Sequence, residues 1–104
     1  MKKFITHNDE HIDVDGTSFQ DYIHATYEQL TDIFGEPHNY EGYKTDAEWD
    51  IMFADKTVAT IYNWKDGKNY CGREGVNVEY ITDWHIGGHG KKSANKVKSV
   101  IGAM

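Results

Sequence analysis

Two neighbouring segments of alternating or β-rich sequence constrain the fold most strongly. Between Ala47 and Phe53 the apolar residues occupy every second position, which is typical of a strand with one buried face. A short turn at 54–56 leads into T-V-A-T-I-Y-N-W (57–64), which is rich in β-branched and aromatic residues. An Asp-Gly turn signal follows at 65–68. These segments predict two strands, over 47–53 and 57–64, paired as an antiparallel hairpin.

A helical pattern precedes this hairpin. From Ser18 to Phe34 apolar residues recur at three- and four-residue steps, which predicts an amphipathic helix over this range. Thr17 and Gln20 match the capping box that begins many helices. Gly35 and Pro37 mark the end, because glycine accepts positive φ and proline cannot continue a helix.

Three further segments complete the expected elements. Residues 3–6 and 11–14 form either an N-terminal hairpin or an extended arm. Residues 79–86 alternate again and predict a third strand, which Gly87-Gly88 should end. A helical repeat that includes Ala94 and Val97 predicts a C-terminal helix.

The expected fold class is α+β. We predict a small two-layer sandwich, with two helices packed on an antiparallel sheet of three to five strands. A chain of 104 residues fits a single domain over 1–104. The expected core includes six large apolar residues: Leu30, Trp49, Ile51, Phe53, Ile61 and Val97.

Composition excludes several classes of protein. Cys71 is the only cysteine, so neither an internal disulfide nor a cysteine-based zinc site is expected. No apolar run approaches the roughly 20 residues that cross a bilayer, and the N-terminus lacks the apolar core of a secretory signal. A cytoplasmic location without a membrane partner is expected. The net charge of −6 disfavours binding to duplex nucleic acid.

Charge is distributed unevenly along the chain. Residues 1–50 carry 12 acidic residues against 3 lysines, a net charge of −9, whereas residues 51–104 have a net charge of +3. A partner-binding surface or simple solvation would account for the acidic side of the predicted helix. The candidate partner-binding residues are three acids on that helix and two tyrosines in the loop over 38–46: Asp21, Glu28, Asp32, Tyr40 and Tyr43.

Aromatic residues provide a second candidate site. Tyr62 and Trp64 share one face of their predicted strand, and Trp84 on another strand could join them. Such a group is either part of the core or a platform on which a nucleotide stacks. If the rings line an open cleft near the basic residues Lys65, Lys68 and Arg73, a nucleotide or a short single strand could stack there, with Lys65 and Arg73 among the ligand-binding residues.

Histidine and aspartate provide a third, catalytic alternative. Asp83 and His85 would point to the same side of a strand, and His89 completes an H-x-x-x-H spacing. The two glycines between these histidines argue against a helix, and the sequence identifies no third zinc ligand. A second pair, His7 and His11, could take up metal adventitiously. No metal or cofactor is therefore expected.

An enzyme is not expected. The sequence contains no phosphate-binding glycine loop, dinucleotide-binding turn or nucleophile elbow. Cys71 lacks an evident base, so a structural or surface thiol is the favoured interpretation. The alternative is a metal-dependent enzyme that uses Asp83, His85 and His89.

Five stretches carry a resemblance that covers most of the chain: T-S-F-Q-D-Y (17–22), F-G-E-P (34–37), A-E-W-D-I-M-F (47–53), T-V-A-T-I-Y-N-W-K-D-G-K-N-Y (57–70) and I-T-D-W-H-I-G-G (81–88). Together they resemble a family of short, uncharacterised bacteriophage accessory proteins. The resemblance implies a viral protein that acts in the cytoplasm of the host bacterium, and it transfers no catalytic residues. Lys56 departs from the pattern, which has glycine at this turn position.

The context implied by the resemblance favours a binding function. Small acidic phage proteins without catalytic motifs often act by occupying a host protein. The expected function is that of an inhibitor or adaptor, including an anti-defence, anti-CRISPR-like protein, that binds a host protein such as a defence nuclease through acidic and aromatic surface. The alternative is a protein that sequesters a small ligand or nucleotide signal. The oligomeric state stays open.

Overall fold

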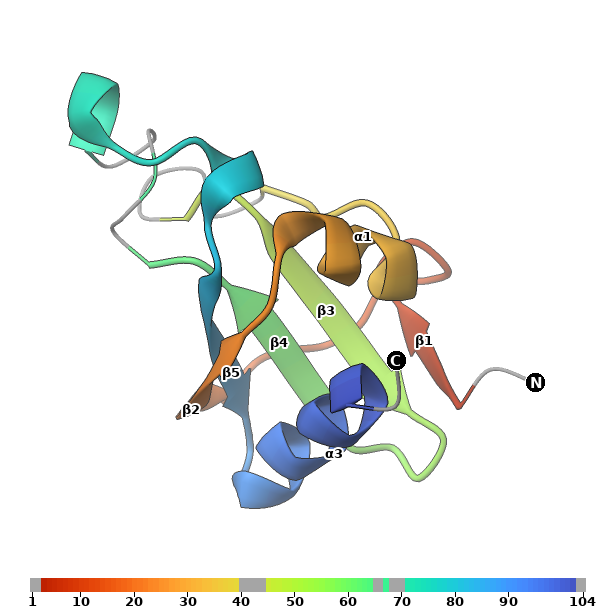
Figure 1. The fold of residues 1–104 in the computed structure, drawn as a ribbon. Helices are drawn as coiled ribbons and strands as arrows, with labels where there is room; N and C mark the ends of the chain where they lie inside the picture. Colours follow the sequence, from red (N-terminus) through yellow and green to blue (C-terminus); the bar gives the residue numbers. More distant parts are fainter. Residues whose placement is uncertain (1–2, 40–44, 65–66, 68–70, 103–104) are drawn as a thin grey trace.

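A five-stranded antiparallel sheet carries two helices on one face (Figure 1). The computed structural model describes residues 3–39, 45–64, 67 and 71–102. The strands lie in the order β1-β3-β4-β5-β2, which confirms the predicted α+β sandwich. Their bounds are β1 (Phe4–Thr6), β2 (Ser18–His24), β3 (Glu48–Phe53), β4 (Val58–Tyr62) and β5 (Asp83–Gly88). The helices are α1 (Tyr27–Phe34) and α3 (Lys91–Gly102), and two 3-10 turns are η1 (Gly72–Glu74) and η2 (Val78–Tyr80).

The central hairpin confirms the prediction from alternation. β3 and β4 pair antiparallel, with Trp49 opposite Ile61. The turn between them places Lys56 at φ 74°, a conformation in which glycine is the usual residue. Lys56 therefore adopts a strained backbone conformation at this turn.

The predicted helix over 18–34 is wrong in its first half. Ser18–His24 forms strand β2, and the helix begins only after Thr26. The capping box is formed by Thr26 and Gln29: the Thr26 hydroxyl accepts from the Gln29 backbone N–H at 3.0 Å, and the Gln29 side chain accepts from the Thr26 N–H at 2.8 Å. Gly35 adopts φ 84° at the helix end, where the sequence predicted it.

A β-bulge explains the incorrect helical assignment. The register of β2 against β5 shifts between Phe19 and Asp21. The shift inserts one extra residue into β2. As a result the rings of Phe19 and Tyr22, three positions apart, are in contact, with centroids 4.8 Å apart. A bulged strand therefore reproduced the spacing of a helix.

The third-strand prediction also needs correction, whereas the N-terminal prediction left two alternatives open. β1 pairs with β3, and residues 11–14 have no regular structure, so of those alternatives the hairpin between 3–6 and 11–14 does not form. Val78–Tyr80 is a 3-10 turn, and β5 begins at Asp83.

Gly87 and Gly88 lie inside β5 and do not end it. A Cβ on Gly88 would stand 2.2 Å from Ser93 Oγ in α3, and a Cβ on Gly87 would stand 2.4 Å from Thr60 Oγ1. Glycine is therefore used here for close approach on both faces of the sheet.

The core lies between the helices and the sheet. All six predicted core residues are buried: Leu30, Trp49, Ile51, Phe53, Ile61 and Val97. Trp49 and Trp84 meet edge to face, with ring centroids 5.3 Å apart. Each indole N–H donates to a backbone carbonyl, that of Gly35 at 2.7 Å and that of Ala25 at 2.9 Å, so neither buried donor lacks an acceptor.

No helix formed by the described residues lies over the opposite face of the sheet, which we call the helix-free face. The chain between β1 and β2 passes behind the sheet in Figure 1, and Ile12 of this segment is buried. It reaches β2 through a turn at 14–17, in which Gly16 has φ 81° and the Thr17 N–H donates to the Val14 carbonyl at 3.2 Å. Within the described residues, no helix has the length and apolar character needed to cross a membrane.

Candidate functional site

One row of side chains crosses the helix-free face from edge to edge. Tyr22 on β2 is the register partner of His85 on β5, and His85 is the partner of Tyr62 on β4. Tyr62 is in turn the partner of Glu48 on β3, which forms an isolated bridge with His38. Because register partners project to the same face of a sheet, these five side chains form a continuous row.

The β2 end of the row is an aromatic cluster of five rings: Phe19, Tyr22, Tyr62, Trp64 and His85. Tyr62 and His85 are stacked, with centroids 5.3 Å apart and planes at 22°. The ring centroid of His85 is 5.0 Å from that of Tyr22 and 5.4 Å from that of Phe19, and both contacts are edge to face. The ring centroids of Tyr62 and Trp64 are 6.2 Å apart. The five rings together line a pocket of about 360 Å³.

This aromatic cluster is open to solvent. The exposed fractions are 46% for Phe19, 59% for Tyr22 and 40% for Trp64. Large apolar rings with this exposure, gathered at one place, are typical of a binding surface. The helix-free face therefore presents preformed aromatic contacts to a ligand or a partner.

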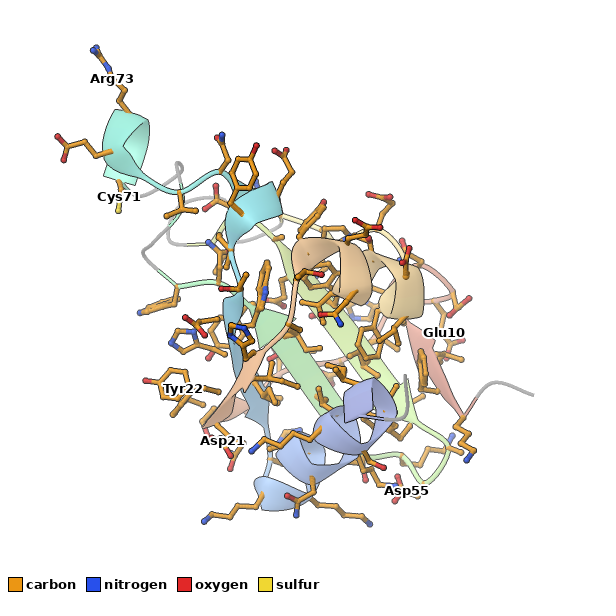
Figure 2. All side chains as sticks on the ribbon, in the orientation of Figure 1. Glu10, Asp21, Tyr22, Asp55, Cys71 and Arg73 are labelled. Atoms are coloured by element: carbon orange, nitrogen blue, oxygen red, sulfur yellow. The ribbon has the colours of Figure 1, made fainter. Side chains whose placement is uncertain are left out.

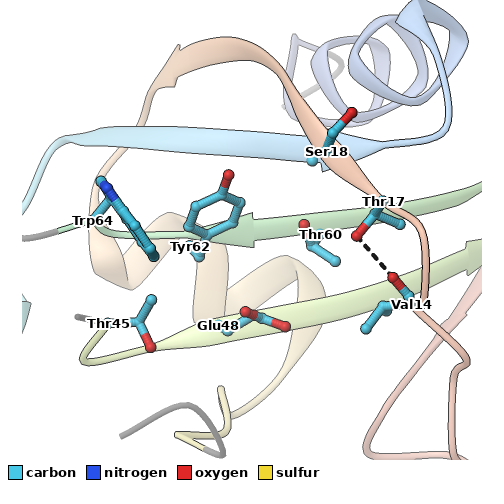
Figure 3. Close-up of a pocket in the computed structure, with 9 residues that line it drawn as sticks. Val14, Thr17, Ser18, Thr45, Glu48, Thr60, Tyr62 and Trp64 are labelled. Atoms are coloured by element: carbon cyan, nitrogen blue, oxygen red, sulfur yellow. Dashed lines mark hydrogen bonds between the residues drawn. The ribbon is translucent and has the colours of Figure 1, made fainter. Parts of the chain in front are cut away.

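A second pocket adjoins the aromatic cluster (Figure 3). Its volume is about 220 Å³, and Tyr62 and Trp64 form part of its wall. Thr17, Ser18 and Thr60 supply hydroxyl groups to its lining. The pocket thus combines two aromatic rings with hydrogen-bonding groups, a combination suited to a small polar ligand.

Burial raises the pKa of Tyr62, and the negative charge of Glu48 adds to this effect. Both causes favour the neutral phenol, because removal of its proton would place a second negative charge in the row. Tyr62 therefore remains a hydrogen-bonding neutral group at physiological pH.

The opposite end of the row is polar. His38 Nε2 lies 2.8 Å from Asp50 Oδ2 and 3.4 Å from Glu48 Oε2, and we call these three residues the acid-histidine cluster. Two backbone hydrogen bonds of 2.9 Å between His38 and Glu48 hold the two chain segments together. Burial lowers the pKa of His38, while the Asp50 carboxylate opposes this shift.

His7, the residue that follows β1, supports this cluster. Its Nδ1 accepts from the Asp50 backbone N–H at 3.3 Å, and its Nε2 lies 2.8 Å from the Glu36 carbonyl. Its ring meets that of His38 edge to face at 4.7 Å. The cluster opens on a cleft of about 910 Å³, whose other wall includes Asp13.

The predicted acidic helix face does not exist as such. Asp21 lies on β2, where it pairs with Lys98 of α3, and this contact lowers the pKa of Asp21. Figure 2 shows Asp21 near Tyr22 on this strand. Glu28 and Asp32 are exposed on α1, so the three acids occupy two different elements. Tyr40 and Tyr43 lie outside the described residues.

Of the residues expected to form a nucleotide platform, the structure brings together Tyr62 and Trp64. Trp84 is fully buried in the core and does not join them, which corrects that expectation. Its register partner on β2 is Ile23, so it faces the helices and not the open face. Arg73 points away from the sheet at η1 (Figure 2), and Lys65 lies outside the described residues.

Asp83 and His85 project to the same face of β5, as predicted, but the three residues of the proposed catalytic trio contact different groups. Asp83 Oδ1 lies 3.1 Å from His24 Nδ1 at the exposed edge of the sheet, whereas His85 belongs to the aromatic cluster. His89 lines a separate pocket beside the start of α3. Within the part of the chain that the structure describes, these residues are not among the groups arranged to hold a metal ion.

Sequence reasoning missed both ends of the row. Phe19 and Tyr22 were assigned to a helix, and the partnership of His38 with Asp50 had no local signal. The spacing of Glu48 and Asp50 did place them on one strand face, opposite the buried Trp49. No protein-family model, curated protein or solved structure matches this chain.

Proposed function

We propose that this chain is a binding protein that engages a protein of a bacterial host through its helix-free face. The observation that carries the proposal is the aromatic cluster, in which Phe19, Tyr22 and Trp64 are each 40% to 59% exposed. Tyrosine and tryptophan dominate the energetics of many protein interfaces, because a rigid ring buries a large area at a small cost in conformational entropy. The ring contacts hold these side chains in place before a partner arrives.

The charge of the chain favours a partner with a basic surface. Glu48 and Asp83 are register partners of Tyr62 and His24, so both project to the helix-free face beside the rings. An acidic rim around an aromatic centre would steer a basic partner and reject acidic ones. The aromatic cluster therefore replaces the helix face of Asp21, Glu28 and Asp32 as the proposed contact region.

The resemblance to phage accessory proteins gives this proposal its biological setting. In that setting the protein is an inhibitor or adaptor in the cytoplasm of the host, and a defence nuclease is a partner with the required basic surface. We propose binding and not catalysis, because Asp83, His85 and His89 lie in three different surroundings.

Affinity capture with matched variants tests the proposal. Tyr22→Ala removes the most exposed ring of the cluster, whereas Tyr80→Ala removes a ring that is 72% exposed on η2, away from the row. Wild type and Tyr80→Ala should recover the same host protein from a bacterial lysate, and Tyr22→Ala should recover much less. Equal recovery by all three proteins would contradict the proposal.

A small-ligand function is the second candidate, and the pocket beside Tyr62 and Trp64 favours it. Trp49 and Trp84 are fully buried, so a quencher that enters this pocket acts mainly on Trp64. Millimolar nucleotide should quench the tryptophan fluorescence of the wild type and leave Trp64→Phe nearly unchanged. If the wild type shows no quenching, a nucleotide is excluded as the ligand of this pocket.

A further inference from the structure

We propose that the acid-histidine cluster of His38, Glu48 and Asp50 binds a divalent metal ion. One ligand atom from each residue lies within 4.8 Å of the other two. This combination of one imidazole nitrogen and two carboxylate oxygens suits zinc or manganese. The inference does not rest on the exposed rings that carry the proposed function, and it shares only Glu48 with the acidic rim described there.

The distances from His38 to the two carboxylates are close to those between ligands of such an ion. Ligand atoms about 2.0–2.2 Å from a tetrahedral zinc ion stand about 3.3–3.6 Å from one another. The distance from His38 Nε2 to Glu48 Oε2 is 3.4 Å, and that to Asp50 Oδ2 is 2.8 Å. The first distance matches, and the second needs to widen by about half an ångström, which a small side-chain rotation supplies.

Asp50 provides a second and independent observation. Its side chain is only 7% exposed, and it lies in the wall of the cleft. Its Oδ1 atom is buried and has no hydrogen-bond partner among the described residues. A buried carboxylate oxygen without a donor is costly, and a cation bound at the same carboxylate would offset its negative charge.

The backbone holds the donors in position. Glu48 and Asp50 project to the same face of β3 because they are two residues apart. The bridge between His38 and Glu48, with its two backbone hydrogen bonds of 2.9 Å, fixes the histidine beside them. His7 contacts the Asp50 backbone and the His38 ring, so it acts as a positioning residue.

The surroundings allow an ion to enter and to keep further ligands. Three protein ligands leave coordination positions for water or for a group of another molecule, as in zinc sites that are not purely structural. All three ligand residues line the adjacent cleft of about 910 Å³, whose lining also includes His11 and Asp13. The cluster is therefore a site that an ion can enter from solvent.

Zinc titration of the full chain tests the site. Competition with a chromogenic chelator should show one zinc ion bound per wild-type chain. Asp50→Asn keeps the side-chain volume and removes the charge, and we expect it to weaken zinc binding at least tenfold. Asp83→Asn is the matched control, because Asp83 is an exposed acid beside a histidine on the same face. It should bind zinc as the wild type does.

Two further measurements keep the test decisive. Glu48→Gln removes the more exposed of the two acidic ligands and serves if Asp50→Asn fails to fold. Histidine ring nitrogen NMR should show zinc-dependent displacement of the His38 Nε2 signal, with His24 and His89 unchanged. Absence of zinc binding, equal binding by the ligand variants and the control, or displacement confined to other histidines would overturn the assignment.

Discussion

Tyr62 and His85 stack face to face across the β4–β5 pair, with ring centroids 5.3 Å apart. They are also register partners, so the stack is a direct result of strand pairing. The same register places Tyr22 on the far side of His85 and Glu48 on the far side of Tyr62. An aromatic binding surface and a polar cluster are thereby built on one row of the sheet.

Tyr62 should make the stability of the protein sensitive to alkaline pH. Its folded-state pKa is raised above the ordinary value of 10.0, chiefly by burial. Its contribution is fully present below about pH 10 and is lost as pH rises toward the folded-state pKa, because the unfolded phenol deprotonates first. In urea unfolding between pH 8 and 11, the free energy of unfolding should fall less steeply with pH for Tyr62→Phe than for the wild type.

Tyr27 provides an internal comparison for that experiment. Burial also raises the pKa of Tyr27. Tyr27→Phe should therefore also make the free energy of unfolding fall less steeply at alkaline pH. The double variant should show the shallowest decline. Identical slopes for the wild type and all variants would contradict the proposed role of burial.

Lys56→Gly should stabilise the chain. Lys56 has φ 74°, a region that costs an L-residue roughly 1–2 kcal/mol. The greater freedom of glycine in the unfolded state offsets part of this gain, so we expect a net stabilisation of about 0.5–1 kcal/mol. Lys56→Ala keeps a Cβ and serves as the control in chemical denaturation. A glycine variant no more stable than the alanine variant would argue against strain at this turn.

Gly88→Ala should destabilise the contact between α3 and the sheet. A Cβ at this position would stand 2.2 Å from Ser93 Oγ and 3.2 Å from the Val58 carbonyl. Ser93 Oγ already donates to that carbonyl at 2.6 Å, so it has little room to move. We expect a loss of about 1–3 kcal/mol in the free energy of unfolding.

Gly90→Ala is the matched control for that substitution. A Cβ on Gly90 meets no atom within 4 Å, so its effect should stay within about 0.5 kcal/mol. Similar losses for the two variants in thermal or chemical denaturation would show that crowding against Ser93 is not the cause.

The sequence predicted the elements whose signals are local. The alternation from Ala47 to Phe53 and the β-branched segment after it are confirmed as β3 and β4. The repeat that includes Ala94 and Val97 is confirmed as α3. In each case the residues that carry the pattern are also the ones that pack, so local periodicity and tertiary structure agree.

The incorrect predictions arose where tertiary contacts decide between two local solutions. Thr17-x-x-Gln20 and Thr26-x-x-Gln29 both match a capping box, and pairing of β2 with β5 selects the second. The face on which Trp84 lies depends on the strand register. Ile86 pairs with Ile61, so Trp84 lies in the core. A one-residue shift in the pairing would have placed it on the helix-free face. His38 reaches Asp50 only through the isolated bridge to β3.

We expect the aromatic cluster on the helix-free face to bind a partner protein. The most direct test of this binding is affinity capture from a bacterial lysate with wild type, the double variant Phe19→Ala/Tyr22→Ala and the control Tyr80→Ala. Circular dichroism should first establish that all three proteins are folded. We expect the wild type and the control to recover one common host protein, with recovery falling as salt rises, because screening acts over about 8–10 Å near physiological ionic strength. The double variant should fail to recover that protein. Recovery of the same protein by all three, or by none of them, would contradict binding through the aromatic cluster.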